Sequence, residues 1–467
     1  MSTFKDYSYE RPSMGRIEAE FEKLLKEFGQ AEAFAAQDLI MAKINNLRNE
    51  FESMATLVYI RHSIDTTDEF YEKENDYFDE ISPLYEGLVH KYYQSLVNSK
   101  YREALEEKWG KQLFRMAELK LKTFSPEIIE DLQKENKLAS QYTKLRASAK
   151  IMFEGEERNL SQMAPFMEAK DRDLRKRAQE NFTGFFLENE AQFDEIYDNL
   201  VKIRHEIAKK LGYKNFIELG YARLARSDYN AKMVAGYRKQ VFETLVPLAT
   251  KLRKRQAKRL NLDTLKYYDE PLEFLTGNAV PKGDPAWIIE NGKKMYSELS
   301  PEAGEFFDFM VKTELLDLVT KKGKAGGGYT TYISKYKAPF IFSNFNGTSG
   351  DIDVLTHEAG HAFQVYYSRN YQVPEYIWPT LEACEIHSMS MEFLTWPWMN
   401  LFFIEDEEKY KFAHLSSAVL FIPYGVTVDE FQHWVYEHPE ATPSERKATW
   451  RKIEEKYLPH RDYEEND

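Results

Sequence analysis

Helix-start signals recur along this chain, and they constrain its fold more than any other feature of the sequence. At each signal a Ser or Asp that suits the N-cap precedes a proline that suits the first helical turn. The signals are Ser82-Pro83, Ser125-Pro126-Glu127, Asp284-Pro285 and Ser300-Pro301-Glu302. The segments between them are charged, with apolar residues at helical spacing, so the pattern predicts helix after helix. A capping box at Thr442-Pro443-Ser444-Glu445 predicts one more helix near the end.

The length of the chain predicts more than one compact unit. At 467 residues it exceeds the size at which a single core stops growing, so we expect two domains or one large helical body with two lobes. Apolar residues make up 43% of the chain, which is enough for a sizeable core. Its 30 Tyr and 31 Phe must be buried or must line a cavity.

The charge balance and the targeting signals narrow the class of protein. With 63 Lys and Arg against 77 Asp and Glu, the net charge of −14 argues against a nucleic-acid partner. The start of the chain does not read as a secretory signal, and we expect no membrane-spanning run. A single cysteine, Cys384, allows no internal disulfide. We therefore expect a cytoplasmic protein without a membrane or nucleic-acid partner.

Residues 323–348 interrupt the helical pattern. Glycines 326 to 328 break any helix, and the runs "YTTYI" and "PFIFSNF" are rich in residues that favour strands. We expect a small antiparallel β-sheet here, and a plain surface loop is the alternative. The glycines would let a backbone or a ligand approach closely. The element leads directly into a segment with two histidines.

His357, Glu358 and His361 form the pattern H-E-x-x-H. Ser349-Gly350-Asp351 signals the start of the helix that carries them. On a helix the two imidazoles lie on one face, so both can bind one metal ion. The Glu358 carboxylate lies about 100° around the helix, beside the metal, where it can take a proton from a metal-bound water.

A catalytic zinc site needs a third protein ligand and an open position. A layout with a third histidine is excluded, because Tyr367 stands where that histidine would be. The remaining candidates are glutamates on the connecting loop and on the helix predicted after Pro379: Glu375, Glu382, Glu385 and Glu392. The last three share one helix face, and spacing alone favours Glu382 or Glu385 without separating them.

The run "HEAGHAFQ", followed 24 residues after His361 by "EIHSMSME", resembles the M3 family of zinc metallopeptidases. The closest match is the oligoendopeptidase F branch, which includes bacterial Pz-peptidases. In that family the third ligand begins an E-x-x-S pattern with a second glutamate seven residues on. Glu385, Ser388 and Glu392 fit this pattern, and Glu382 does not.

The resemblance implies the composition of the site. One Zn²⁺ is expected to be held by His357, His361 and Glu385, with Glu358 as the catalytic base. Glu382, one helical turn before Glu385, is expected to orient a ligand imidazole.

The resemblance also implies a fold. We expect a mostly α, large two-lobed helical body, split by a deep substrate channel, with the small antiparallel sheet beside the metal-site helix. Residues 1–200 are expected to form the N-terminal lobe that covers the channel. Residues 201–467 are expected to form the catalytic lobe, with zinc-site helices at 351–368 and 379–395.

The function implied by the resemblance is zinc-dependent endopeptidase activity on internal bonds of short oligopeptides, which a narrow channel admits. The backbone of Gly327, Gly328 and Tyr329 is expected to bind the substrate by β-addition. A helical zinc carboxypeptidase is the enzymatic alternative, because it shares the motif and the channel.

One feature of the resembled family is missing from this sequence. There, a histidine and tyrosines on a Gly/Tyr-rich segment beyond the metal helices help to stabilise the oxyanion. The surroundings of Tyr457, His460 and Tyr463 do not match that segment, so the C-terminal end of the family fold is expected to be missing. A catalytically weak, zinc-containing peptide-binding protein is therefore a second alternative.

Overall fold

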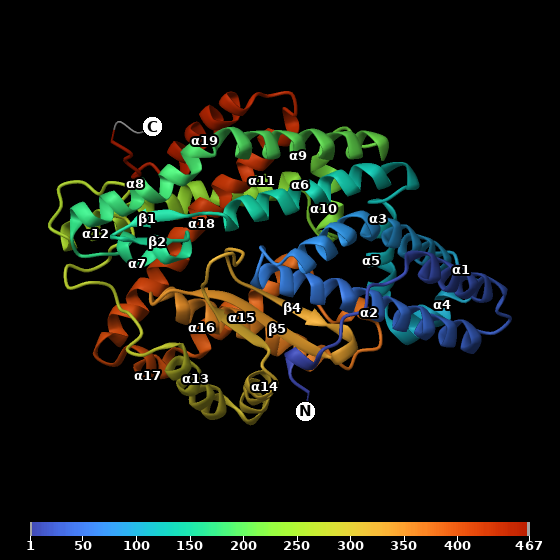
Figure 1. Ribbon diagram of the computed structural model, residues 1–467. Coiled ribbons are helices and arrows are strands. Elements are labelled where there is room, and N and C mark those ends of the chain that lie inside the picture. Colours follow the sequence, from blue (N-terminus) through green and yellow to red (C-terminus); the bar gives the residue numbers. More distant parts are fainter. Residues whose placement is uncertain (1, 465–467) are drawn as a thin grey trace.

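The computed structural model describes residues 2–464, which are mostly helical (Figure 1). The helices up to residue 223 are α1 (Met14–Gln30), α2 (Phe34–Ile64), α3 (Glu69–Val97), α4 (Arg102–Trp109), α5 (Lys111–Leu121), α6 (Ile129–Ala147), α7 (Ala164–Met167), α8 (Arg172–Glu188), α9 (Glu190–Lys210) and α10 (Phe216–Arg223). The later helices are α11 (Ala231–Gln240), α12 (Val246–Arg259), α13 (Pro285–Leu299), α14 (Pro301–Lys312), α15 (Gly350–Ser368), α16 (Leu381–Leu394), α17 (Asn400–Phe403), α18 (Glu407–Glu437) and α19 (Pro443–Tyr457). The strands are β1 (Ile151–Phe153), β2 (Glu156–Arg158), β3 (Leu316–Val319), β4 (Tyr329–Ile333) and β5 (Ala338–Phe345).

Several predicted helix starts are confirmed by their caps. The Asp284 carboxylate accepts the amide of Trp287 at the start of α13, at 2.8 Å. Ser300 begins α14 in the same way, and Thr442 forms the predicted capping box at the start of α19. Each cap satisfies an amide that has no partner within its own helix.

The predicted helix start at Ser82-Pro83 is wrong, because Pro83 lies inside α3. A proline within a helix leaves the carbonyl four residues earlier without its amide partner. Here that carbonyl belongs to Asp79, and the side chain of Asn136 on α6 donates to it at 3.2 Å. A contact between two helices therefore compensates for the missing hydrogen bond, and this contact has no signal in the local sequence.

The sheet beside α15 has the strand order β3-β5-β4. β4 and β5 pair antiparallel, with Tyr329 opposite Phe342, which confirms the expected antiparallel pair within 323–348. The sheet is nevertheless mixed, because β3 pairs with β5 in parallel. The sequence analysis also missed the hairpin of β1 and β2.

The position of β5 explains its apolar sequence. It is the central strand of its sheet and is almost wholly buried, so both of its faces need apolar side chains. β5 leads into α15, which packs against the sheet, and α2 contacts β4 (Figure 1). β4 lies at the edge of the sheet, with β5 as its one neighbour.

The largest hydrophobic core joins parts of the chain that are far apart in sequence. It contains side chains from Tyr7 to Ala117 together with side chains from Ala279 to Tyr410. Smaller cores hold the intervening helices, for example around Ile207 and around Ala178. The helices up to α5 therefore pack on the half of the molecule that contains the sheet, and a lobe boundary near residue 200 stays a prediction.

The loop between α15 and α16 is fixed by the N-terminal helices. The Glu375 carboxylate pairs with the Arg48 guanidinium at 2.8 Å and accepts the Tyr93 hydroxyl at 2.6 Å. The side chains of Arg48 and Glu375 are both almost fully buried. The Tyr376 hydroxyl donates to the carbonyl of Trp109 at 2.6 Å. These contacts position the start of α16 against the rest of the molecule.

One segment corrects the expectation that no run could span a membrane. Asn400–Glu437, which includes α17 and α18, is long and apolar enough by length and composition alone. Core helices of soluble proteins pass the same test, so a single segment of this kind is weak support for a membrane span.

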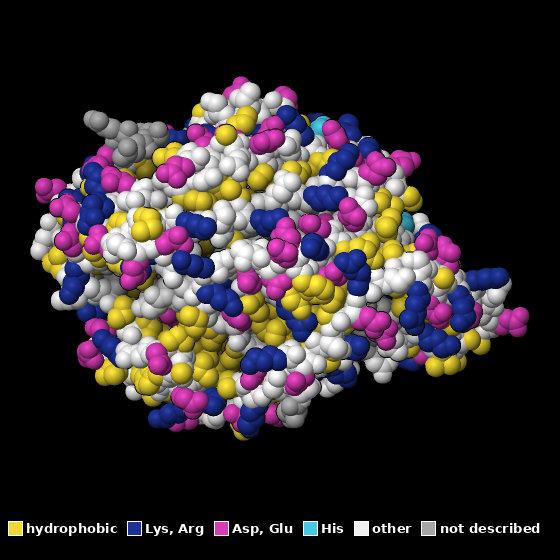
Figure 2. All heavy atoms as spheres, viewed as in Figure 1, with side chains coloured by type: hydrophobic (Ala, Val, Ile, Leu, Met, Phe, Trp, Pro, Cys, Tyr) yellow, Lys and Arg dark blue, Asp and Glu magenta, His cyan; other side chains and the backbone are white. Residues whose placement is uncertain are grey.

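Helix α16 carries several exposed apolar side chains. Figure 2 shows hydrophobic side chains gathered over the region of α13 and α16 on the face drawn. On α16 the exposed apolar residues are Leu381, Ile386, Met389 and Leu394.

Candidate active site

Helix α15 carries the H-E-x-x-H residues as predicted. Its first turn is bonded to the short segment that follows strand β5, because the Asp351 carboxylate accepts hydrogen bonds from the amides of Asn346 and Gly347 at 2.9 and 2.8 Å. His357 and His361 follow on one face of this helix, one turn apart. The local helix geometry therefore brings the two imidazoles together without help from the rest of the fold.

Gly360 allows α16 to approach α15 closely. A Cβ added at this position would lie 2.7 Å from the Cα of Ser388 and 2.9 Å from the carbonyl oxygen of His387. Both atoms belong to the backbone of α16, which cannot give way as the end of a flexible side chain can. The absence of a side chain at Gly360 therefore sets the distance between the two helices.

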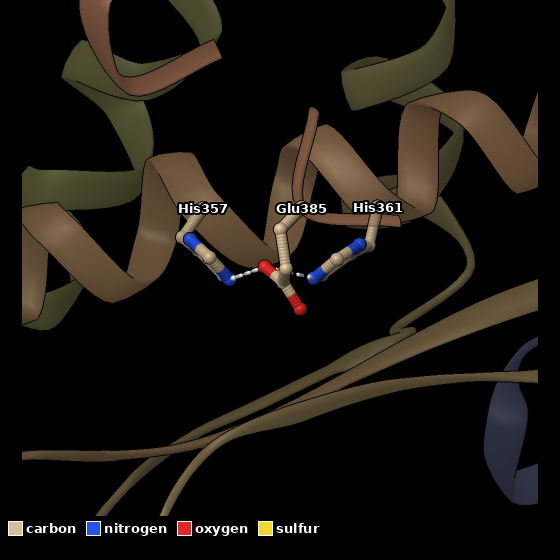
Figure 3. Close-up of side chains that lie close together, drawn as sticks. All are labelled: His357, His361 and Glu385. Atoms are coloured by element: carbon tan, nitrogen blue, oxygen red, sulfur yellow. Dashed lines mark ion pairs between the residues drawn. The ribbon is translucent and has the colours of Figure 1, made fainter. Parts of the chain in front are cut away.

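The close approach brings Glu385 on α16 between the two histidines (Figure 3). One Glu385 oxygen, Oε2, lies 3.0 Å from His357 Nε2 and 3.6 Å from His361 Nε2. One donor atom from each of the three residues lies within 4.8 Å of the other two. Ser388 donates its hydroxyl to the same Glu385 oxygen at 2.9 Å, which gives the E-x-x-S spacing a physical reason.

The donor set fits a catalytic zinc ion. Two imidazole nitrogens and one carboxylate are a known ligand set for catalytic Zn²⁺, and they leave one coordination position open. Burial and the neighbouring His357 lower the pKa of His361 to about 4, so its imidazole is neutral near pH 7. A neutral imidazole is the form that binds a metal.

Glu358 lies beside the three converging residues and is held by strand β4. Its Oε2 accepts a hydrogen bond from the hydroxyl of Thr330 at 2.7 Å, and Glu358 as a residue is 7% exposed. Burial raises the pKa of Glu358 above its ordinary value. A carboxylate with a raised pKa takes up a proton more readily, as a general base must. No local pattern in the sequence indicates Thr330, because it is brought to Glu358 by the packing of β4 on α15.

Glu392 is the partner of the His357 imidazole. Its Oε1 lies 2.6 Å from His357 Nδ1, and its Oε2 lies 2.6 Å from Nε2 of His414 on α18. Burial acts to raise the pKa of Glu392, but hydrogen bonds from the two histidines outweigh it and hold the pKa below its ordinary value. An ionised carboxylate between two imidazoles fixes the ring of His357.

Glu382 lies elsewhere than the sequence analysis predicted. Its carboxylate accepts a hydrogen bond from Arg226 at 2.6 Å, whereas the imidazole of His357 contacts Glu392. The other imidazole, His361, has its Nδ1 3.3 Å from Nε2 of His387. Glu382 and Glu392 are ten residues, or about 15 Å, apart along α16, so the point at which this helix crosses α15 decides which of the two reaches His357.

The glycine-rich segment lies directly beside Glu358. The glycines at 326–328 are exposed, and a Cβ added at Gly328 would lie 3.6 Å from Glu358 Oε1. Gly327 has a φ of +88°, which favours glycine. The ring of Tyr329 stacks on Phe342 with 4.7 Å between centroids, so this side chain packs on the sheet.

Of the three C-terminal residues considered for the oxyanion, the two tyrosines have hydrogen-bond partners, whereas neither ring nitrogen of His460 has one among residues 2–464. The Tyr457 hydroxyl donates to Glu430, and the Tyr463 hydroxyl donates to Glu454. His460 lies 3.8 Å from Glu270. The Gly/Tyr-rich segment that the sequence comparison led us to expect has no match among these residues.

Comparison with known families covers both ends of the chain. The profile of the peptidase M3 N-terminal domain matches residues 4–124, and that of peptidase family M3 matches residues 303–467. The second match contains both metal-site helices.

A solved structure, Pz peptidase A with an inhibitor, is similar over almost the whole chain. It is 65% identical and superposes with a TM-score of 0.99, over 99% of this chain and 83% of its own.

Curated relatives are more distant. Oligopeptidase PepF of Bacillus subtilis (strain 168) is 23% identical, over 91% of this chain and 66% of its own length. An oligoendopeptidase F homolog of Borreliella burgdorferi is 26% identical over 230 residues, 38% of its length. The chain thus spans at most about two thirds of the curated relatives that it matches. The two profile matches and the high identity to Pz peptidase A together establish that the chain belongs to the M3 family of peptidases.

Proposed function

We propose that this protein is a zinc-dependent endopeptidase that hydrolyses internal bonds of short oligopeptides. The observation that carries the proposal is the convergence of His357, His361 and Glu385, whose donor atoms lie within 4.8 Å of one another beside Glu358. One Zn²⁺ is proposed as the cofactor, since two imidazoles and a carboxylate are ligands that zinc commonly takes.

The proposed chemistry divides between the metal and the protein. A bound zinc ion lowers the pKa of water towards about 7 and polarises the carbonyl of the scissile bond. Glu358 takes the proton of the attacking water, and its Oε1 is the oxygen to which the hydroxyl of Thr330 does not donate. The same carboxylate then delivers the proton to the leaving amine.

The free edge of β4 is the proposed binding surface for the peptide backbone. β4 has β5 on one side only, so an extended peptide can add to its other edge by main-chain hydrogen bonds. The exposed glycines Gly327 and Gly328 let that peptide approach Glu358 closely. Binding through the main chain predicts broad tolerance for the side chains of the substrate.

The choice of short peptides and internal bonds rests on the relatives. The names of the curated relatives, oligopeptidase and oligoendopeptidase F homolog, describe such activity for those proteins. We propose that residues 1–200 cover a substrate channel that excludes folded proteins, and that the enzyme acts in the cytoplasm.

The test is mass spectrometry of short peptides, in one set N-acetylated and C-amidated and in a second set with free ends, incubated with the zinc-loaded protein and with Glu358→Gln. Blocked ends prevent exopeptidase cleavage. We expect internal cuts by the wild-type protein, and a loss of about 10²–10⁴ in rate for the variant. The variant should still bind one zinc ion per chain.

The other outcomes identify the alternatives. Release of residues only from peptides with a free C-terminus would indicate a carboxypeptidase. Peptide binding without any cut by the zinc-loaded protein would indicate a peptide-binding protein. Equal cleavage by the wild-type protein and Glu358→Gln would exclude Glu358 as the base.

A further inference from the structure

A chain of hydrogen bonds extends from the metal site into helix α18. His357 Nδ1 contacts Glu392 Oε1, and Glu392 Oε2 contacts His414 Nε2, both at 2.6 Å. The indole Nε1 of Trp396 donates to His414 Nδ1 at 3.1 Å. Four side chains from three parts of the chain are thus joined in one line that ends at the proposed zinc ligand His357.

The directions of the bonds in this line are set by Trp396 at one end and by the Glu392 carboxylate in the middle. An indole N–H can only donate, so His414 Nδ1 must be the acceptor and the proton of this imidazole lies on Nε2. That proton is donated to Glu392, whose ionised carboxylate accepts at both oxygens. Glu392 accepts in turn from His357 Nδ1–H, which leaves the lone pair of His357 on Nε2.

His357 Nε2 is the atom that faces Glu385, at 3.0 Å. The opposite tautomer of His357 would carry a proton on Nε2 and could not bind a metal there. The Glu392 carboxylate, oriented by the hydrogen bond from His414, thus selects the tautomer that the metal site needs.

The middle of this line is held rigidly. His414 is 7% exposed and its ring is packed by Phe393, at 4.8 Å between centroids, and by Tyr410, at 5.5 Å. The hydroxyl of Tyr410 donates to Asp353 on α15 at 2.6 Å, one turn before His357. Helix α18 is therefore fastened to both metal-site helices at this point, which restricts the movement of the His414 ring.

We propose that His414 is a positioning residue for the metal site: by donating to Glu392 it fixes the orientation and the tautomer of His357, and Trp396 fixes the tautomer of His414. This inference rests on the proposed zinc site. His414 acts on the ligand His357 through Glu392, whose carboxylate lies between the two imidazoles.

The test measures zinc affinity by competition with a chromophoric chelator, together with thermal unfolding of the metal-free proteins. His414→Phe keeps an aromatic ring and removes the donor to Glu392. His414→Gln keeps a donor at a position like that of Nε2. Trp396→Phe keeps the packing of an aromatic ring and removes the N–H that fixes the tautomer of His414.

We expect zinc binding to be about tenfold weaker in His414→Phe, restored to within about threefold of wild type in His414→Gln, and weakened to an intermediate degree in Trp396→Phe. Similar melting temperatures of the metal-free proteins would show that folding is not the cause. If His414→Phe does not fold, the zinc affinity of Trp396→Phe is compared with that of the wild-type protein, and a weaker affinity in this variant supports the inference.

Two results would overturn the inference while leaving the zinc site intact. One is unchanged zinc affinity in folded His414→Phe and Trp396→Phe. The other is an equal loss of zinc affinity in the Phe and Gln variants of His414, which would show that the packing of the imidazole matters and its hydrogen bond to Glu392 does not. Failure of the wild-type protein to bind zinc would overturn the metal site, and this inference with it.

Discussion

Replacement of Gly360 by alanine tests whether the spacing of the two helices sets the metal site. The added Cβ would lie 2.7 Å from the Cα of Ser388 and 3.0 Å from the Cβ of Met391. Carbon atoms in contact lie about 3.5–4.0 Å apart, so α16 has to move outward by roughly 0.8 Å or more. Glu385 is on that helix and moves with it, whereas His357 and His361 stay on α15.

The expected change in the stability of the metal-free variant follows from two opposing contributions. Overpacking of this kind costs about 1–3 kcal/mol, and the better helix propensity of alanine returns about 1 kcal/mol. Metal-free Gly360→Ala should therefore be less stable by at most about 2 kcal/mol. Zinc sites tolerate distance errors of only about 0.2 Å, so the displacement of Glu385 should weaken zinc binding by at least about 10–100-fold, or about 1.4–2.7 kcal/mol.

The assay is a zinc competition titration beside urea denaturation of the metal-free protein. Gly184→Ala on α8 is the matched control, because a Cβ added there meets nothing within 4 Å. The free energy of unfolding of this control should be higher than that of the wild-type protein by about 0.5–1 kcal/mol, and its zinc affinity should be unchanged. Wild-type zinc affinity in Gly360→Ala would refute the argument that this glycine sets the helix spacing.

Three further predictions concern the base, the buried ion pair of Arg48 with Glu375, and the metal. Thr330→Val should lower kcat/KM about tenfold or more, because the hydrogen bond to the Glu358 carboxylate is lost, and zinc affinity should stay unchanged. A variant with the kcat/KM of the wild-type protein would contradict the role of Thr330 in holding Glu358. Arg48→Met should lower the free energy of unfolding, measured in urea, by about 3–5 kcal/mol, since it leaves the Glu375 carboxylate buried without its cation. A decrease below about 1 kcal/mol would contradict the importance of this ion pair for stability. The protein with its zinc removed by a chelator should be less stable than the protein with zinc at about 100 times Kd. The free energy of unfolding should be lower by about 2.7 kcal/mol, and Tm in calorimetry should be lower by about 3 °C. An unchanged Tm would argue against a bound metal in the native state.

The residues that the sequence predicted best are those joined by local geometry. His357 and His361 lie one helical turn apart, so their relation follows from the helix itself. Their approach to Glu385 needs the crossing of two helices, and spacing alone did not separate this residue from Glu382. The resemblance to a known family was needed to choose between them.

The parts that sequence reasoning missed depend on contacts between distant segments. Thr330 reaches Glu358 across the packing of a strand on a helix, and His414 reaches Glu392 from another helix. Pro83 looked like a helix start, but Asn136 bonds the carbonyl that this proline leaves free. The tertiary fold brings such partners together, so the local sequence carries no pattern that would predict them.

Some missed strands did carry a signal. Glu154 and Gly155 join β1 to β2 and have φ values of +48° and +80°, and a glycine in such a two-residue connection is a typical hairpin signal. The strand β3 gave no comparable signal, because a run of four residues becomes a strand only through its pairing with β5.

The most direct test of the proposed metal centre is an anomalous difference map at the zinc edge from crystals of the zinc-loaded protein. We predict one peak about 2.0–2.2 Å from His357 Nε2, His361 Nε2 and a Glu385 oxygen, with Glu358 beside the ion and not bound to it. A peak at another set of residues, or none at this site, would contradict the assignment of these three residues as the ligands of a zinc peptidase.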